Sequence, residues 1–145
     1  SSSEEKLRKA SRIGADVTIN YAEEGWAEEV MLATNNKGAD VVIDYVGAAT
    51  FAKSVRCLAK NGRLVTCGAT SGSEAMINIR ELFMAQRSIL GSVSGTMKDF
   101  LAVTKMAAEG KIKPVIDSVY RLKDARKAQE RLLSRQSFGK IILVP

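Results

Sequence analysis

The sequence predicts an α/β protein with a doubly wound parallel sheet, and two observations lead to this prediction. Helix-like and strand-like patterns alternate along the whole chain, which is typical of parallel strands joined by helices. The phrase GADVTINY at 14–21 is also repeated, almost unchanged, as GADVVIDYVG at 38–47. In each copy a stretch that can be helical precedes the glycine, and a run rich in Val and Ile follows the aspartate. Two such half-units in succession predict consecutive strands of a parallel sheet.

The first helix is expected over 4–13, where Leu7, Ala10 and Ile13 share one face and two acids occupy the first turn. Gly14 suits the left-handed conformation that ends many helices, because a Cβ is strained there. The aspartates of the two GADV phrases fit short polar turns. The strands that follow are predicted at Val17–Ile19 and Val41–Ile43.

The alternation continues to the end of the chain. A helix at 48–59 would place Phe51, Val55 and Leu58 on one face, with Lys-Asn-Gly at 60–62 ending it. The later elements are predicted in the order strand 63–68, short helix or turn 78–86, strand 88–95, helix 96–110, extended segment 115–122, helix 123–135 and strand 140–144.

Composition narrows the class of protein. A chain of 145 residues with 46% hydrophobic content normally forms one domain with a real core. No apolar run reaches the roughly 20 residues that a membrane-spanning helix needs. The first residues, SSSEEKLRKA, lack a signal-peptide pattern, so no membrane association and a cytoplasmic location are expected. Because histidine is absent and only Cys57 and Cys67 are present, no metal-ligand spacing exists, and both cysteines are expected to be buried.

The net charge of +6 raises the question of nucleic-acid binding. The 22 Lys and Arg residues are spread over almost every predicted helix, and aromatic content is only 6%. No zinc finger or RNA-binding aromatic signature is present, so no nucleic-acid partner is expected. A solvated basic surface explains the charge, and a site for an anionic small molecule is the alternative.

Small residues follow three of the predicted strands, as YVGAAT at 45–50, CGATSG at 67–72 and LGSVSG at 90–95. In parallel sheets of this kind, ligands bind beyond the carboxyl ends of the strands. Small residues let the backbone approach a flat ligand, and their N–H groups and hydroxyls can bind it. Three such turns at one edge therefore favour a ligand of nucleotide size.

Several phrases together resemble a known family. In chain order, these phrases are INY at 19–21, GADVVIDYVG, NGRLVTCGATSG, SILGSVSG, AEGKIKPVI, LKDARKAQERL and FGKIILVP. Together they are similar to the medium-chain dehydrogenase/reductase superfamily. Its zinc-type alcohol dehydrogenase and quinone oxidoreductase branches are the most similar, and the resemblance covers essentially the whole chain.

The resemblance implies a two-domain, NAD(P)-dependent oxidoreductase of which this chain is the C-terminal part. Residues 1–113 would form a partial dinucleotide-binding Rossmann domain with strands 3 to 6 of the order 3-2-1-4-5-6. Residues 114–145 would return to an absent catalytic domain. Strand 3, Val17–Ile19, would then lack its native neighbour, so the chain alone should be marginally stable and its partner would be the missing N-terminal half or a complementary chain.

The resemblance also assigns cofactor-binding residues. Ser1 falls where NAD-specific members carry an acidic residue that binds the ribose hydroxyls. Ser1, Ser2, Ser3, Lys6 and Tyr21 therefore favour NADP(H) over NAD(H), although Glu4 and Glu5 argue mildly against it. The resemblance places Tyr45 on the adenosine side of the cofactor and Arg135 at its phosphates. The positions assigned beside the pyrophosphate and the nicotinamide ribose are Gly68, Ala69, Thr70 and Ser71. The backbone of Leu90, Gly91 and Ser92 would meet the carboxamide.

The implied reaction is hydride transfer between the nicotinamide and a small-molecule alcohol or carbonyl substrate. Catalytic residues are not identified in this chain, and zinc would enter only through the absent N-terminal part. A zinc-free NADPH quinone oxidoreductase and a non-catalytic nucleotide-binding remnant remain alternatives. The strand at Ser88–Val93 is expected at a sheet edge, where family members often dimerise, so a homo-oligomer is expected.

Overall fold

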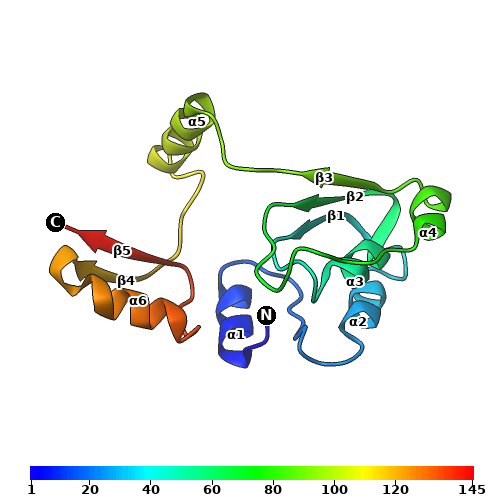
Figure 1. Cartoon of the computed structure of the whole chain (residues 1–145), viewed down its shortest axis with the longest axis horizontal. Helices are drawn as coiled ribbons and strands as arrows, with labels where there is room; N and C mark the ends of the chain where they lie inside the picture. The colour runs from blue at the N-terminus through cyan, green and yellow to red at the C-terminus, as the bar shows by residue number, and fades with distance from the viewer. The chain divides into compact units, whose positions relative to one another are not determined.

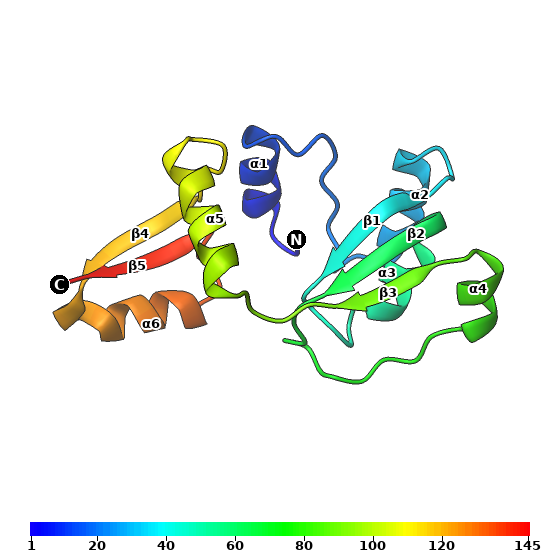
Figure 2. The ribbon, with the colours of Figure 1, turned by 90° about the horizontal axis from the view of Figure 1, so that it is seen from above.

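A three-stranded parallel sheet organises the first part of the chain in the computed structural model, which describes residues 1–145. Its strands are β1 (Ala39–Asp44), β2 (Leu58–Thr66) and β3 (Ser88–Gly91), in the spatial order β1-β2-β3. Both pairings are parallel, and Figures 1 and 2 show the three arrows running side by side in one direction. The predicted α/β class with a parallel sheet is confirmed.

Four helices belong to this part of the chain: α1 (Glu4–Arg12), α2 (Trp26–Ala33), α3 (Phe51–Arg56) and α4 (Ile79–Met84). The helix α3 links β1 to β2, and α4 precedes β3, so each parallel crossover contains a helix. Gly14 and Gly38 have φ values of 110° and 83°, which confirms the left-handed glycine after the helix in each copy of the repeated phrase. The polar turn predicted at the second aspartate is wrong, because β1 begins at Ala39 and Asp40 already lies within that strand.

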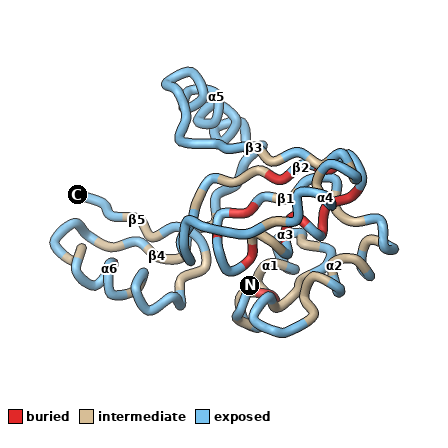
Figure 3. Tube along the Cα trace, turned by 45° about the vertical axis from the view of Figure 1, so that its right-hand side comes forward, coloured by how far each residue is buried: buried red, intermediate tan, exposed pale blue.

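The core lies on one face of the sheet. The register aligns Val42, Leu64 and Ile89 across the three strands, and Leu64 is fully buried against Val55 of α3 and Leu82 of α4. In Figure 3 the buried part of the trace is concentrated along β2, α3 and the end of β1. On the opposite face Val41, Ile43 and Leu90 are each about half exposed or more. Because side chains alternate between faces, only one face of the sheet is covered by the elements of the first part of the chain, residues 1–94.

The remaining elements are α5 (Met97–Ala108), β4 (Ile116–Arg121), the 3₁₀ turn η1 (Leu122–Asp124), α6 (Ala125–Leu133) and β5 (Lys140–Val144). The strands β4 and β5 form a separate parallel pair. The chain divides into two compact units, Ser1–Ser94 and Gly95–Pro145. The functional boundary between residues 113 and 114 stays a prediction.

One carboxylate ties the second unit together. Asp117 of β4 accepts hydrogen bonds from Nε and Nη2 of Arg131 on α6, at 3.1 and 3.0 Å. It also accepts the backbone N–H of Phe138, which precedes β5, at 2.9 Å. These bonds hold the pKa of Asp117 well below its usual value, with the Arg131 hydrogen bonds as the main cause. Asp117 thus joins β4 to the helix and to the segment that leads into β5.

The predicted strand at Val17–Ile19 is wrong, because these residues form no regular strand. A strand forms by backbone pairing with another strand, and here only Ser1 pairs with the segment. The Ser1 amine donates to the carbonyl of Ile19 at 3.2 Å, and the N–H of Tyr21 donates to the carbonyl of Ser1 at 3.1 Å. This exchange is the hydrogen-bond pattern of one parallel bridge, so the segment is extended but unpaired beyond that point.

The predicted helix at 48–59 is also too long, since α3 ends at Arg56. Lys60, Asn61 and Gly62 do not end a helix but lie within β2. The pairing of β1 with β2 shifts register between Ala39 and Val41, and Asn61 has a positive φ of 62°. The Lys-Asn-Gly turn signal therefore marks an irregularity inside a strand. The longest helix, α5, has 12 residues, and none of the helices has the length and hydropathy of a membrane span.

Candidate functional site

The carboxyl ends of β1, β2 and β3 meet at one edge of the sheet, as the parallel arrangement requires. The register places Asp44 beside Thr66 and Thr66 beside Gly91. Beyond the last ladder positions, the N–H of Ser92 donates to the carbonyl of Thr66 at 2.9 Å. The three small-residue segments singled out in the sequence thus converge at the edge where such folds bind ligands.

Hydrogen bonds join the segment after β1 to the loop after β2. The carbonyl of Val46 accepts both the N–H of Ser71 at 2.8 Å and the Ser71 hydroxyl at 2.6 Å. The N–H of Ala48 donates to the carbonyl of Gly72 at 3.0 Å, and the N–H of Ala49 donates to the Ser71 hydroxyl at 3.0 Å. The two segments therefore form one connected surface, here called the double loop, consisting of residues 45–50 and 68–72.

Glycine is needed inside the double loop for close backbone approach. A Cβ on Gly68 would lie 2.8 Å from the carbonyl oxygen of Tyr45. A Cβ on Gly47 would lie 2.5 Å from the carbonyl oxygen of Gly72, and Gly47 has a φ of 90°. At Gly91, in contrast, nothing lies within 4 Å of the Cβ position. The first two glycines allow close packing of the loops, whereas no part of this chain packs against the Cβ position of Gly91.

A cavity of about 260 Å³ lies within this edge. Its lining contains only small, apolar or hydroxyl-bearing residues, with no ionisable side chain among them: Gly47, Ala48, Phe51, Thr66, Gly68, Ala69, Gly72, Ser73 and Ala75. Such a lining offers backbone N–H groups, hydroxyls and apolar surface, which are the groups that fix flat, neutral parts of a ligand.

Sequence reasoning missed one residue at this edge, Asp44, the last residue of β1. It is 4% exposed. Its Oδ1 accepts the N–H groups of Val46 and Gly47, both at 3.0 Å. Its Oδ2 accepts the hydroxyls of Thr50 at 2.8 Å and Ser54 at 2.7 Å. Burial alone would raise the pKa of Asp44, but these four hydrogen bonds, that of Gly47 foremost, lower it below its usual value.

A sequence signal for Asp44 existed. An aspartate at a strand end, followed by glycine three residues later and by hydroxyl residues at the start of the next helix, can close a turn on its own side chain. The phrase DYVGAAT and the later Ser54 meet that description.

The residues predicted around the ribose 2′ position, Ser1, Ser2, Ser3, Lys6 and Tyr21, gather at the start of α1. Ser1 and Tyr21 are joined by their backbones. Ser3 is the N-cap of α1 and accepts the N–H of Lys6 at 3.5 Å, while its own N–H donates to the Ser1 hydroxyl at 3.3 Å. Ser2 lies between them in the chain. Arg135, in contrast, belongs to the second unit, just after α6.

The two cysteines differ in exposure. Cys57 is 2% exposed, and burial is the main reason that its pKa is raised. Cys67 is exposed, so the prediction that both are buried is wrong for it. The residue follows the last position of β2, where the chain leaves the covered sheet for the loop.

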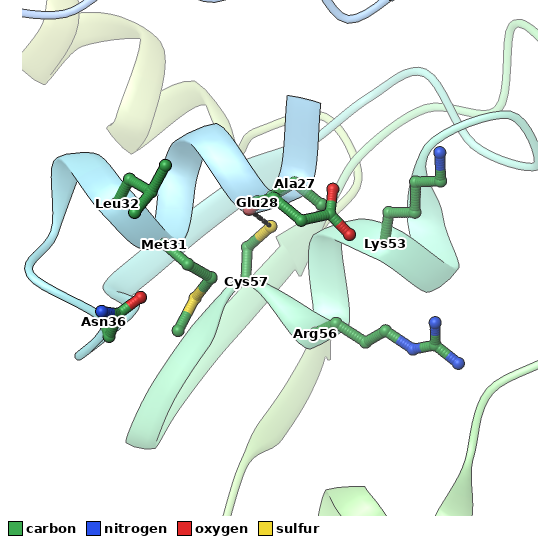
Figure 4. Close-up of a pocket in the computed structure, with 8 residues that line it drawn as sticks. All are labelled: Ala27, Glu28, Met31, Leu32, Asn36, Lys53, Arg56 and Cys57. Carbon is green, nitrogen blue, oxygen red and sulfur yellow. Dashed lines mark hydrogen bonds between the residues drawn. The ribbon is translucent and has the colours of Figure 1, made fainter. Parts of the chain in front are cut away.

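A second cavity, of about 330 Å³, lies between α2 and α3 (Figure 4). It is lined by Ala27, Glu28, Met31, Leu32, Asn36, Lys53, Arg56 and Cys57. Cys57 points toward the carbonyl of Ala27, 3.7 Å from its sulfur. None of the cofactor-binding residues predicted from the sequence lines this cavity, so the cavity is separate from the strand-end site.

No group of three His, Cys, Asp or Glu side chains in this structure could hold a metal ion. The chain has no histidine, and its two cysteines differ in burial and lie on different segments. The residues of this chain therefore do not fit a zinc site.

Comparison with known proteins gives consistent matches along the chain. Residues 13–143 match the family described as zinc-binding dehydrogenase. The NAD-dependent alcohol dehydrogenase of Saccharolobus solfataricus is 31% identical over 143 residues, which cover 98% of this chain and 41% of that protein. The quinone oxidoreductase of Pseudomonas aeruginosa is 33% identical over 153 residues, covering 99% of this chain and 47% of that protein.

Solved structures agree with the sequence matches. A crystal structure of an NAD-dependent alcohol dehydrogenase superposes with a TM-score of 0.89 and 38% identity, covering 100% of this chain and 42% of that one. The chain thus spans less than half the length of the relatives it matches. Since both the family match and the structural likeness extend over nearly all of it, the chain belongs to the zinc-binding dehydrogenase family of the medium-chain dehydrogenase/reductase superfamily.

Proposed function

We propose that this chain supplies the cofactor-binding part of an NAD(P)-dependent oxidoreductase of alcohol dehydrogenase type. The whole protein would transfer a hydride between a nicotinamide cofactor and an alcohol or carbonyl substrate. The observation that carries the proposal is the double loop at the carboxyl edge of β1 and β2, next to the open backbone of Gly91. Family membership and the names of the relatives support the same reaction class.

Residues at this edge would hold the cofactor. The backbone and hydroxyls of Gly68, Ala69, Thr70 and Ser71 would lie along its ribose and pyrophosphate, and Tyr45 would lie on the adenosine side. Leu90, Gly91 and Ser92 would meet the carboxamide with their backbone. When bound, the cofactor supplies or accepts the hydride at its nicotinamide ring. The chain's own contribution is binding, orientation and exclusion of water.

We also propose that another polypeptide segment completes the site. The outer edge of β1 is unpaired, and the sheet face that carries Val41, Ile43 and Leu90 is exposed. A missing N-terminal half or a complementary chain would cover both and would bring the substrate site, with zinc if the protein is of the zinc branch.

The proposed cofactor preference is NADP(H) over NAD(H). Ser1, Ser2, Ser3, Lys6 and Tyr21 would surround the ribose 2′ position, where a hydroxyl or an ammonium group tolerates a phosphate and a carboxylate does not. Titration of the natural protein with NADPH and NADH, followed by reduced-nicotinamide fluorescence, tests this preference. A lower Kd for NADH than for NADPH would contradict it.

A zinc-free quinone oxidoreductase is the second candidate, because a relative of that name is 33% identical, as similar as the alcohol dehydrogenases. The deciding experiment uses the protein from its natural source. Its denatured mass, its zinc content and its turnover of alcohols, aldehydes and quinones are measured together. Zinc with alcohol turnover supports the first candidate, and quinone turnover without zinc supports the second. A denatured mass of 15.7 kDa with no turnover would leave a nucleotide-binding remnant.

The exposed edge of β3 is the proposed contact of a homodimer. β3 is the outer strand of its sheet, and beyond it Val93 is 87% exposed. Exposed apolar edges favour pairing with another strand. Replacement Val93→Lys should convert a dimer to monomer in light scattering. The control Leu32→Lys, at a 69% exposed position of α2 on the rim of the cavity between α2 and α3, should not.

A further inference from the structure

We propose that Asp44 is a positioning residue for the cofactor: its buried carboxylate fixes the turn after β1, on which the loop after β2 is built, and thereby sets cofactor affinity. This inference rests on the proposed cofactor site and adds to it a residue whose side chain lies beneath the double loop.

The carboxylate of Asp44 is fully engaged by neutral donors. One oxygen takes two backbone N–H groups, and the other takes two hydroxyls. A carboxylate offers about four acceptor positions, so all of them are used. Burying a charge is unfavourable unless it is hydrogen-bonded, and this arrangement of four donors is what makes the buried charge tolerable at the end of β1.

Each oxygen has a separate structural effect. Oδ1 draws the N–H groups of Val46 and Gly47 inward, which turns the chain immediately after β1. Oδ2 accepts the hydroxyls of Thr50, the N-cap of α3, and of Ser54, the fourth residue of the same helix. The turn is thus held at its start by one oxygen and at its exit by the other.

The loop after β2 depends on the conformation of that turn. The Val46 carbonyl receives two hydrogen bonds from Ser71, and Ala48 donates to Gly72. Gly47 leaves no space for a side chain between the two segments. A turn released from Asp44 would move the groups to which Ser71 and Gly72 are bonded, so the loop that lies along the cofactor would lose its fixed position.

The alternative is that Asp44 only stabilises the fold. Four changes separate the two possibilities. Asp44→Ala removes all four hydrogen bonds, and the double variant Thr50→Val with Ser54→Ala removes those on Oδ2 only. Asp44→Asn keeps an acceptor for the backbone N–H groups, and the hydroxyls can rotate to accept from its amide, so it should be mild. Leu58→Ala is the control: Leu58 is fully buried but pairs with Ala39 at the amino end of the sheet.

The experiment uses the full-length natural protein and measures three quantities: the free energy of unfolding, the Kd for NADPH and NADH, and amide hydrogen exchange of residues 68–72 without cofactor. For Asp44→Ala and the double variant we expect exchange at 68–72 and the cofactor Kd each to rise about tenfold or more. Asp44→Asn should change both by less than about threefold. Leu58→Ala should lower stability and leave both unchanged.

The proposal is overturned if the double variant destabilises the protein but leaves exchange at 68–72 and the Kd as in Leu58→Ala. If Asp44→Ala does not fold, the double variant decides. If the unmodified protein binds neither dinucleotide, the proposed function fails, and the exchange of residues 68–72 alone then supports or overturns the role of Asp44.

Discussion

Gly47 provides a sharp test of how the double loop works, through the change Gly47→Ala with Gly14→Ala as its matched control. Both glycines have positive φ values, 90° and 110°. A left-handed conformation costs a residue with a Cβ about 1–2 kcal/mol, so both variants should lose a similar free energy of unfolding from the backbone alone.

The two sites differ in their surroundings. Nothing lies within 4 Å of a Cβ at Gly14, whereas a Cβ at Gly47 meets the Gly72 oxygen at 2.5 Å and the Cα of Ala69 at 2.9 Å. To reach ordinary contact, the loop after β2 must move away by about 1 Å, and a misplacement of that size can cost about a hundredfold in rate. We therefore expect kcat/KM of the natural protein to fall by about a hundredfold in Gly47→Ala and to stay near that of the unmodified protein in Gly14→Ala.

The assay pairs denaturant unfolding with steady-state kinetics and cofactor titration, all on the same preparations. Unfolding reports the backbone strain common to the two variants, and kinetics report the displacement of the loop. Equal activity of the two variants at equal loss of stability would contradict this expectation, because the clash with Gly72 would then have no functional effect.

Three further outcomes are expected. Leu64→Ala, in the fully buried centre of β2, should lower the free energy of unfolding by about 2–5 kcal/mol in denaturant titration; a loss within experimental error would mean that this face is not the core. Asp117→Asn should destabilise the protein at pH 7, because the folded-state pKa of Asp117 is lowered mainly by Arg131. A lowered pKa contributes stability that is fully present above the unfolded value of about 3.9 and is lost as the pH falls below it. The difference in unfolding free energy between the unmodified protein and Asp117→Asn should therefore shrink below pH 4, and a difference independent of pH would speak against the ion pair. Iodoacetamide should alkylate the exposed Cys67 well before Cys57, whose thiol is buried with a raised pKa, and NADPH should slow the reaction at Cys67; peptide mapping that finds Cys57 modified first would be inconsistent with the structure.

The sequence predicted best those elements whose beginning and end are marked by residues within a short stretch of the chain. The repeated GADV phrase carries its own helix stop, and the structure has positive φ at Gly14 and Gly38. Apolar runs at 41–43, 63–66 and 88–91 are strands because they pair with one another in this chain. The segment Val17–Ile19 has the same local pattern but only Ser1 to pair with, so pattern alone could not decide its structure.

The candidate site was predictable where it depended on strand ends and less so where it depended on tertiary contacts. Parallel strands bring their carboxyl ends to one edge of the sheet. For this reason the segment that contains Tyr45 contacts the loop that contains Gly68 and Ser71, as the sequence predicted. Asp44 had a local signal in the glycine three residues after it, but half of its bonds are to Thr50 and Ser54, which reach it only once α3 has formed. Gly47 and Gly68 were expected to let a ligand approach the backbone. In the structure, the space that a side chain would take at each glycine is occupied by backbone atoms of the neighbouring segment.

Hydrogen exchange of the full-length natural protein, with and without saturating NADPH or NADH, tests whether the strand-end edge binds the cofactor. We expect the cofactor to slow exchange at residues 44–48, 66–72 and 90–93 and to leave exchange unchanged at residues 26–36, beside the cavity between α2 and α3. Protection confined to residues 26–36, or no protection anywhere in this chain, would contradict the assignment of the strand-end edge as the cofactor site.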